Sequence, residues 1–281
     1  MTKRACACGG TSLVASEPDR LSALPDCLLH TIMSFLKARQ VVQTCVLSTR
    51  WRHLWCSVPC LDIDIDEFNT GSGLSYLGVP HNDKNWEDFE DFALNLMLRS
   101  NIALMDSFRL NISCTKAPYF GSQLAASWLR RAMKYHAPSH SIQLAESSNS
   151  WRLKRMYLCN IFLDDRFTKH VFSEESTTTC KQFKNLRNLL LENCDVSDDF
   201  QTMALFLETS PNLEKLTLRH CTISNGSKKW SSSQCRSLNV RHANLKLTKI
   251  IYKDDVCQLV QHFVHNSENL PNNQFEFRKV D

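Results

Sequence analysis

Residues 186–194 read LRNLLLENC, and residues 213–221 read LEKLTLRHC. The two stretches share the template LxxLxLxxC. In the LxL part, alternate residues of a short strand point to the same face, and the cysteine follows where the chain turns back. A unit of this size buries its apolar face only against neighbouring copies, so the sequence predicts a stack of repeats.

Weaker copies of the template occur on both sides of this pair. Four degenerate copies begin at Leu153, Cys235, Met105 and Leu245. Two shorter alternating segments cover residues 61–65 and 142–144. Each of these suggests a further strand. Recurrence at irregular spacing along most of the chain favours a repeat array over a single closed core.

The segments between the predicted strands carry apolar residues at helical spacing. We expect helices over about residues 198–209 and 256–265, and others around residues 86–96 and 124–132. Strand followed by helix is the signature of leucine-rich repeats, which predicts an α/β fold with an irregular solenoid over residues 61–281. An ordinary α/β domain with leucine-rich strands is the alternative, and the two near-identical templates argue against it.

Composition excludes several classes of protein. The chain has 7 glycines and 8 prolines in 281 residues, and the glycines form neither GxGxxG nor a Walker loop, so a nucleotide-dependent enzyme is not expected. A net charge of +4 is too small to indicate a nucleic-acid surface. No apolar run is long enough for a membrane span.

Cysteine usage indicates the compartment. The 13 cysteines are an odd number, and the N-terminus lacks the apolar stretch of a signal peptide, so we expect an intracellular protein of the nucleus or cytoplasm. Cys6 and Cys8 supply only two of the four ligands that zinc needs. We therefore predict no metal and no cofactor, and a disordered tail over residues 1–18.

Residues 19–60 differ from the repeats. Leu24, Leu28 and Ile32 belong to an apolar set at helical spacing, with Pro25 in the first turn, and Trp51 begins a third apolar set after a valine-rich second one. The pattern predicts three short helices. Such a module is too small to form a large core, so we expect another part of the chain or a partner to cover it.

Two stretches of this module carry a family resemblance. Residues 24–36 (LPDCLLHTIMSFL) and 46–55 (VLSTRWRHLW) resemble an F-box, and most of all that of the plant F-box/leucine-rich-repeat family. The resemblance implies binding to the Skp adaptor and, through it, to the cullin of an SCF ubiquitin ligase. The implied adaptor contacts, by motif position, are Leu24, Pro25, Leu28, Leu29, Ile32, Leu36 and Trp51. The alternative is that these residues are only the core of a helical bundle.

The residues between the inward leucines are predicted to face outward on the concave sheet of the solenoid. We expect them to bind a protein substrate: Tyr157, Glu192, Thr217, Arg219, Asn239 and Arg241. The expected function is therefore that of a non-catalytic substrate-recognition subunit. Cys194 and Cys221 are expected to be structural residues of the template.

Two other functions stay open at this point. One is a scaffold unrelated to ubiquitin, or a receptor that binds no substrate, since family members usually continue with more repeats and we expect this chain to be C-terminally truncated. The other is an enzyme that uses a cysteine or a histidine. No HExxH, GxSxG or paired CxxC motif supports the enzyme.

Overall fold

The computed structural model describes most of the two predicted regions. The described residues are 20–21, 23–68, 83–101, 104–112, 125–129, 152–172, 183–197, 201–224, 241–253, 259–260, 263–264 and 267–280. The predicted tail, the strand at 142–144 and the template copy at Cys235 lie outside them, apart from residues 241–243 at the end of that copy.

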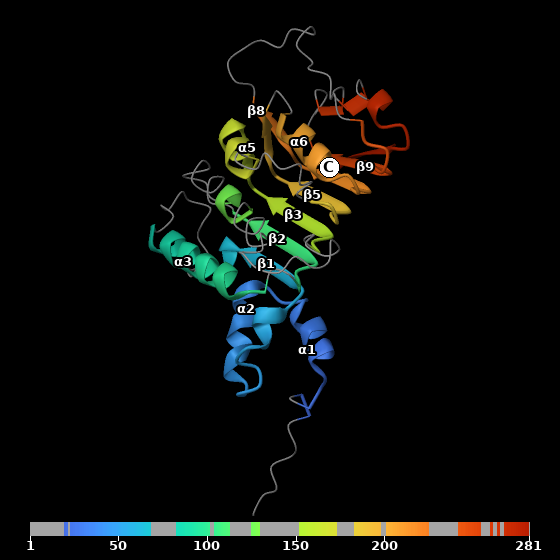
Figure 1. Ribbon diagram of the computed structural model, residues 1–281. Helices are drawn as coiled ribbons and strands as arrows, with labels where there is room; N and C mark the ends of the chain where they lie inside the picture. Colours follow the sequence, from blue (N-terminus) through green and yellow to red (C-terminus); the bar gives the residue numbers. More distant parts are fainter. Residues whose placement is uncertain are drawn as a thin grey trace, which may run out of the picture.

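The repeats form one parallel sheet. In the described part of the chain it has seven strands, in the order β1 (Cys60–Asp64), β2 (Ser107–Asn111), β3 (Arg155–Cys159), β5 (Asn188–Glu192), β7 (Lys215–Arg219), β9 (Leu247–Tyr252) and β10 (Gln274–Lys279). The sheet runs from β1, beside the N-terminal helices, to the C-terminal strands at the other end of the molecule (Figure 1). Consecutive repeats therefore lie side by side in chain order, as the template predicts.

Register between the strands stacks the template leucines in rows. Leu189 pairs with Leu216, and Leu191 pairs with Leu218, with Met156 and Leu158 continuing the same rows on β3. These side chains are buried in one contiguous core. The row fades at β10, where Phe275 is partly buried and Phe277 is exposed.

A left-handed residue ends three of the strands. Asn160, Asn193 and His220 have φ of 58°, 50° and 50°, and asparagine and histidine tolerate this region better than most residues. The next residue in the second and third of these turns is the template cysteine. The Cys194 thiol donates to the Leu158 carbonyl at 3.3 Å and the Cys221 thiol to the Leu191 carbonyl at 3.4 Å, so each thiol ties its turn to the preceding repeat.

A second, smaller sheet follows these turns. Among the described residues it has three parallel strands, β4 (Phe162–Leu163), β6 (Asp195–Ser197) and β8 (Thr222–Ser224). The sequence did not indicate it, since strands of two or three residues leave no alternating pattern.

Asparagines shortly before β7, β9 and β10 hold the other edge of the repeats together. Their Nδ2 groups donate to backbone carbonyls of the preceding repeat: Asn212 to Lys184 at 2.7 Å, Asn244 to Pro211 at 2.8 Å and Asn272 to Ala243 at 2.8 Å. The repeats are thus joined at both ends of their strands as well as through the core.

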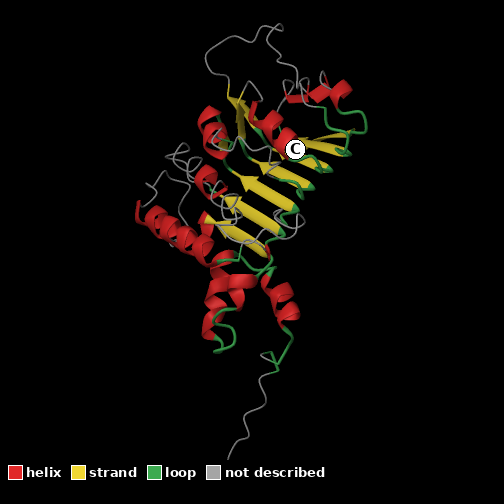
Figure 2. Ribbon diagram, in the orientation of Figure 1, coloured by secondary structure: helices red, strands yellow, loops and turns green. Residues whose placement is uncertain are grey.

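Helices cover one side of the main sheet (Figure 2). They include α3 (Asp83–Arg99), α5 (Asp165–Val171) and α6 (Gln201–Thr209). The predictions near residues 86–96 and 198–209 are confirmed, residues 125–129 are helical, and so are the described residues of the 256–265 prediction. The sequence did not indicate α5 or β10. No helix of the described ranges is long and apolar enough to cross a lipid bilayer.

The N-terminal module contains α1 (Asp26–Met33) and α2 (Ala38–Gln43), followed by two 3₁₀ turns, η1 (Thr44–Val46) and η2 (Leu54–Ser57). The third helix expected from residue 51 is present as the short 3₁₀ helix η2 and not as an α-helix. The backbone there makes i→i−3 hydrogen bonds, as from Leu54 to Trp51 at 3.3 Å, and therefore closes tight turns instead of an α-helix. The module has a small core of its own, consisting of Leu29, Met33, Val41, Trp51 and Val58.

Candidate protein-binding surfaces

Helix α1 presents apolar side chains to solvent as well as to the core. Leu29 and Met33 are buried, whereas Leu28 and Ile32, the residues directly before them in the sequence, are exposed. Leu28 and Ile32 are four residues apart and therefore lie on the same face of the helix. Phe35 follows the end of the helix and is 85% exposed.

A second group of exposed apolar side chains lies at η1. Val46 is 82% exposed, and Leu47 is exposed beside it. The segment is held near α1 by an ion pair between Arg50 and Asp26. Large apolar side chains that are exposed together are typical of surfaces that bind other proteins. We call Leu28, Ile32, Phe35, Val46 and Leu47 the exposed apolar set.

The predicted adaptor contacts divide into surface and core. Pro25, Leu28 and Ile32 are exposed, and Leu24 and Leu36 are half-buried against the small core. Leu29 and Trp51 are buried within that core, so their assignment as surface contacts is corrected: they shape the module and offer no area to a partner. Phe35, Val46 and Leu47 are exposed residues that the motif positions had not singled out.

A chain of polar contacts joins the N-terminal module to the repeats. The Lys37 ammonium bonds Asp64 Oδ2 at 2.5 Å, and Asp64 Oδ1 accepts from Asn111 Nδ2 at 2.9 Å. Asn111 Oδ1 in turn accepts from Asn160 Nδ2 at 2.6 Å. The hydrogen bond that the Lys37 ammonium donates to Asp64 raises the pKa of Lys37, which keeps the ammonium charged. Lys37 precedes α2, so the contact fixes this helix against β1.

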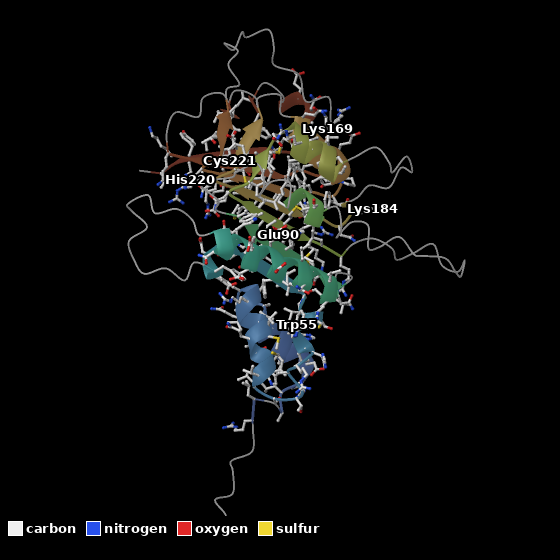
Figure 3. All side chains as sticks on the ribbon, turned by 90° about the vertical axis from the view of Figure 1, so that its left-hand side faces the viewer. Trp55, Glu90, Lys169, Lys184, His220 and Cys221 are labelled. Carbon is white, nitrogen blue, oxygen red and sulfur yellow. The ribbon has the colours of Figure 1, made fainter. Side chains whose placement is uncertain are left out.

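Apolar contacts support the same junction. Ala38 belongs to the core of the repeats, and Trp55 packs against both cores. Figure 3 places Trp55 in the N-terminal module, below α3 and its Glu90. Arg39 lies over the Phe68 ring, with its guanidinium carbon 4.6 Å from the ring centroid. The module is therefore anchored to the first repeat in a defined orientation.

Three of the predicted substrate contacts share one face of the main sheet. Tyr157, Glu192 and Arg219 alternate with the buried template residues, and Glu192 bonds Arg219 at 3.3 Å between the carboxylate and the guanidinium. These three lie where the sequence placed them.

The other predicted substrate contacts differ. Thr217 is buried, because its short side chain lies in register between Leu190 and Lys249 on the neighbouring strands. Arg241 lies in the loop before β9, which begins at Leu247 within the template copy at Leu245. Asn239 lies outside the described residues.

The buried cysteines have the chemistry of structural residues. Burial raises the pKa of Cys159 to about 11 and that of Cys221 to about 12, and it raises the pKa of Cys194 well above its ordinary value. Their thiols stay protonated at neutral pH and are weak nucleophiles. Within the described ranges, no three His, Cys, Asp or Glu side chains are grouped so as to hold a metal ion.

Two family models match the chain. The model described as "F-box domain" matches residues 21–62, and the model described as "FBD-associated F-box protein At5g56370, LRR repeats" matches residues 133–278. The first match contains the exposed apolar set. The second contains the main sheet from β3 onward and ends at Arg278, within β10.

Relatives from Arabidopsis thaliana show the same two parts. The chain is 29% identical over 227 residues to F-box/LRR-repeat protein At3g03360, which covers 76% of this chain and 41% of the relative. It is 28% identical over 206 residues to F-box/FBD/LRR-repeat protein At4g00160, covering 72% and 41%. Over 54 residues it is 56% identical to F-box/FBD/LRR-repeat protein At5g22660, covering 19% and 12%. The chain spans about two fifths of the length of the relatives that it matches most extensively.

Proposed function

This chain belongs to the plant F-box/leucine-rich-repeat family, and we propose that it acts as the substrate-recognition subunit of an SCF-type cullin ubiquitin ligase. In this role the F-box binds the Skp adaptor, the adaptor links the chain to the cullin, and the repeats hold a protein substrate. The proposal places the chain inside the cell, in the nucleus or the cytoplasm.

The exposed apolar set carries the proposal. Its five members lie within the segment that matches the F-box model, and each is exposed although Leu29, Met33 and Trp51 nearby are buried. An amphipathic helix that lays its apolar face in a partner's groove needs this arrangement of Leu28 and Ile32. The buried residues hold the helix, and the exposed ones supply the area that binding removes from water.

The junction supports the transfer part of the proposal. A receptor of this kind contributes proximity, because it holds a substrate lysine near a ubiquitin-charged conjugating enzyme and so raises the effective concentration of the lysine. Proximity requires a fixed relation between the adaptor surface and the substrate surface. Lys37, Asp64 and Trp55 join the two parts in this way.

The substrate surface in this proposal is the outer face of the main sheet around Tyr157, Glu192 and Arg219. These side chains come from three neighbouring strands, β3, β5 and β7, and two of them are already joined by an ion pair. Repeat proteins commonly bind partners across such a face, since each strand adds one position to it.

Copurification with the Skp adaptor and cullin tests the proposal. We compare the wild-type chain with a Leu28→Ala/Ile32→Ala variant. Each truncation should remove roughly 1–2 kcal/mol of apolar burial from the complex, so capture should fall by about a hundredfold. Both side chains are exposed in the free chain, so the midpoint of thermal unfolding should be little changed.

A matched control removes exposed apolar side chains from the repeat region. Leu98→Ala/Val264→Ala truncates residues with similar exposure and should leave adaptor capture unchanged. The proposal is rejected if the folded wild-type chain captures no adaptor, or if both double variants lose it equally.

A further inference from the structure

A row of basic side chains follows the edge where the strands of the main sheet begin. They occupy the residues just before each strand or its first position: Arg152, Lys154, Arg155, Arg187, Lys215 and Lys246. All six are exposed. They come from β3, β5, β7 and β9, which are consecutive neighbours, so at roughly 4.8 Å per strand the row spans about 14 Å. We call these six residues the basic edge.

Two carboxylates lie among these six cations but do not neutralise the positive charge of the basic edge. Asp106 is 3.8 Å from Arg152 and 3.6 Å from Lys154, and Glu214 pairs with Arg187 and lies 3.5 Å from Lys246. The side chains of the two acids are 26% and 33% exposed, whereas those of their four basic partners are 52–69% exposed. The cations therefore project further into solvent, and the edge keeps a positive surplus.

Further along the strands, the outer face of the same sheet carries acid–base pairs between neighbouring strands: Asp62 with Arg109 at 3.9 Å, Glu192 with Arg219 at 3.3 Å and Lys249 with Glu276 at 3.0 Å. Each acid of these three pairs is matched by one cation, whereas six cations face two acids where the strands begin. A positive surface favours a partner of opposite charge.

We infer that the basic edge binds an acidic segment of the protein substrate. The inference rests on the proposed function and adds a chemical class to the substrate. The backbone contacts between repeats hold the cations at fixed intervals. An extended acidic segment that runs across the strands can therefore place a carboxylate next to a cation at almost every strand. Arg152, Arg155 and Arg187 can each bond a carboxylate in bidentate fashion.

An acidic polypeptide fits this edge better than a nucleic acid does. Asp106 and Glu214 interrupt the row, and a phosphate backbone, with a charge at every nucleotide, would meet them at close range. The strand-start positions in the described part of the chain also carry no aromatic side chain on which a base could stack. An acidic polypeptide can place small neutral residues opposite the two carboxylates.

Fluorescence anisotropy with a labelled peptide tests the inference on the full chain. The probe alternates glutamate and serine and is about eight residues long, since each extended residue covers roughly 3.3 Å and the row must be spanned with some excess. The test variant is Lys154→Gln/Lys215→Gln. The matched control, Lys169→Gln/Lys253→Gln, removes the same charge from α5 and from the opposite edge of the sheet (Lys169 is labelled in Figure 3).

The test variant should bind the peptide about tenfold more weakly than the wild type, and the control should stay within about twofold. Equal weakening in both variants, no binding of the peptide to the wild type, or tighter binding of an oligothymidine of equal length would overturn the inference. Adaptor capture by the same preparations separates the two proposals. Capture that persists while the peptide result fails rejects only the acidic segment, and loss of capture by the wild type rejects the proposed function.

Discussion

The F-box and the repeat region bury their apolar side chains to different degrees. The F-box has a small core of its own and leaves the five large apolar residues of the exposed apolar set, and Leu21, in water. The repeats stack their leucines in continuous rows, and charged side chains line the outer face and one edge of their sheet. The surface of the first region resembles one side of a protein–protein interface. The second region buries most of its template leucines within its own core.

This difference suggests two kinds of recognition in one molecule. Binding through the exposed apolar set depends on the removal of apolar area from water, which salt hardly weakens. Binding through the basic edge depends on charge attraction, which salt screens. Lys37 and Trp55 join the two regions. We therefore expect the regions to stabilise each other and to keep a fixed relative orientation, although they bind partners through different chemistry.

The largest expected effect is the loss of a side chain from the stacked rows. Leu218 is fully buried on β7, in register between Leu191 and Ile250. Leu218→Ala should lower the free energy of unfolding by about 2–5 kcal/mol, because the packed neighbours cannot close the cavity. Urea denaturation followed by circular dichroism measures it.

Leu28→Ala is the matched change in the exposed apolar set and should alter the same free energy by less than about 0.5 kcal/mol. Equal effects from the two truncations would contradict the contrast between the regions.

A smaller effect is expected at the junction. Lys37→Met leaves the buried Asp64 carboxylate without its ammonium partner and should cost about 1–2 kcal/mol of unfolding free energy. Asp64→Asn on its own keeps the hydrogen-bonding shape but removes the charge. The double variant should then cost less than the sum of the two single changes, which a double-mutant cycle from urea denaturation reports. Strict additivity would show that the pair does not couple the regions.

The smallest effect concerns the pH dependence of stability that arises from Asp62 on the outer face. Burial raises the pKa of Asp62 above its ordinary value of 3.8, although Arg109 opposes the shift. The folded state therefore favours the protonated carboxyl. The stability that it gains is fully present below pH 3.8 and is lost as the pH rises through the folded-state pKa.

Asp62→Asn removes this loss, so the variant should melt at a higher temperature than the wild type at neutral pH. The gain should fade as the pH falls below the ordinary pKa of the carboxyl. Thermal denaturation across this range measures it, and a gain that does not depend on pH would contradict the assigned cause.

Sequence reasoning succeeded where one local pattern determined the structure. The template LxxLxLxxC predicted β5 and β7 and the buried state of Leu189, Leu191, Leu216 and Leu218, because alternation alone decides which face of a strand is apolar. The F-box was recognised from two short motifs, and the family models confirm it.

Other features depended on contacts between distant residues. In α1 the apolar stripe includes Leu28, Leu29, Ile32 and Met33, and a stripe this wide does not show which half faces the core. The bond from Asn111 to Asp64 joins residues 47 positions apart, and that from Asn160 to Asn111 joins residues 49 apart, so no local pattern reports them. Thr217 faces outward by alternation but is covered by neighbours that only the register brings together.

The most direct test of the account is the affinity of the full chain for the Skp adaptor at low and high salt, measured by isothermal titration calorimetry. If the exposed apolar set carries the contact, we expect binding with a negative heat-capacity change and a Kd that changes by less than about threefold between roughly 0.05 and 0.5 M salt. No binding, or a Kd that rises by about tenfold or more over this salt range, would contradict it.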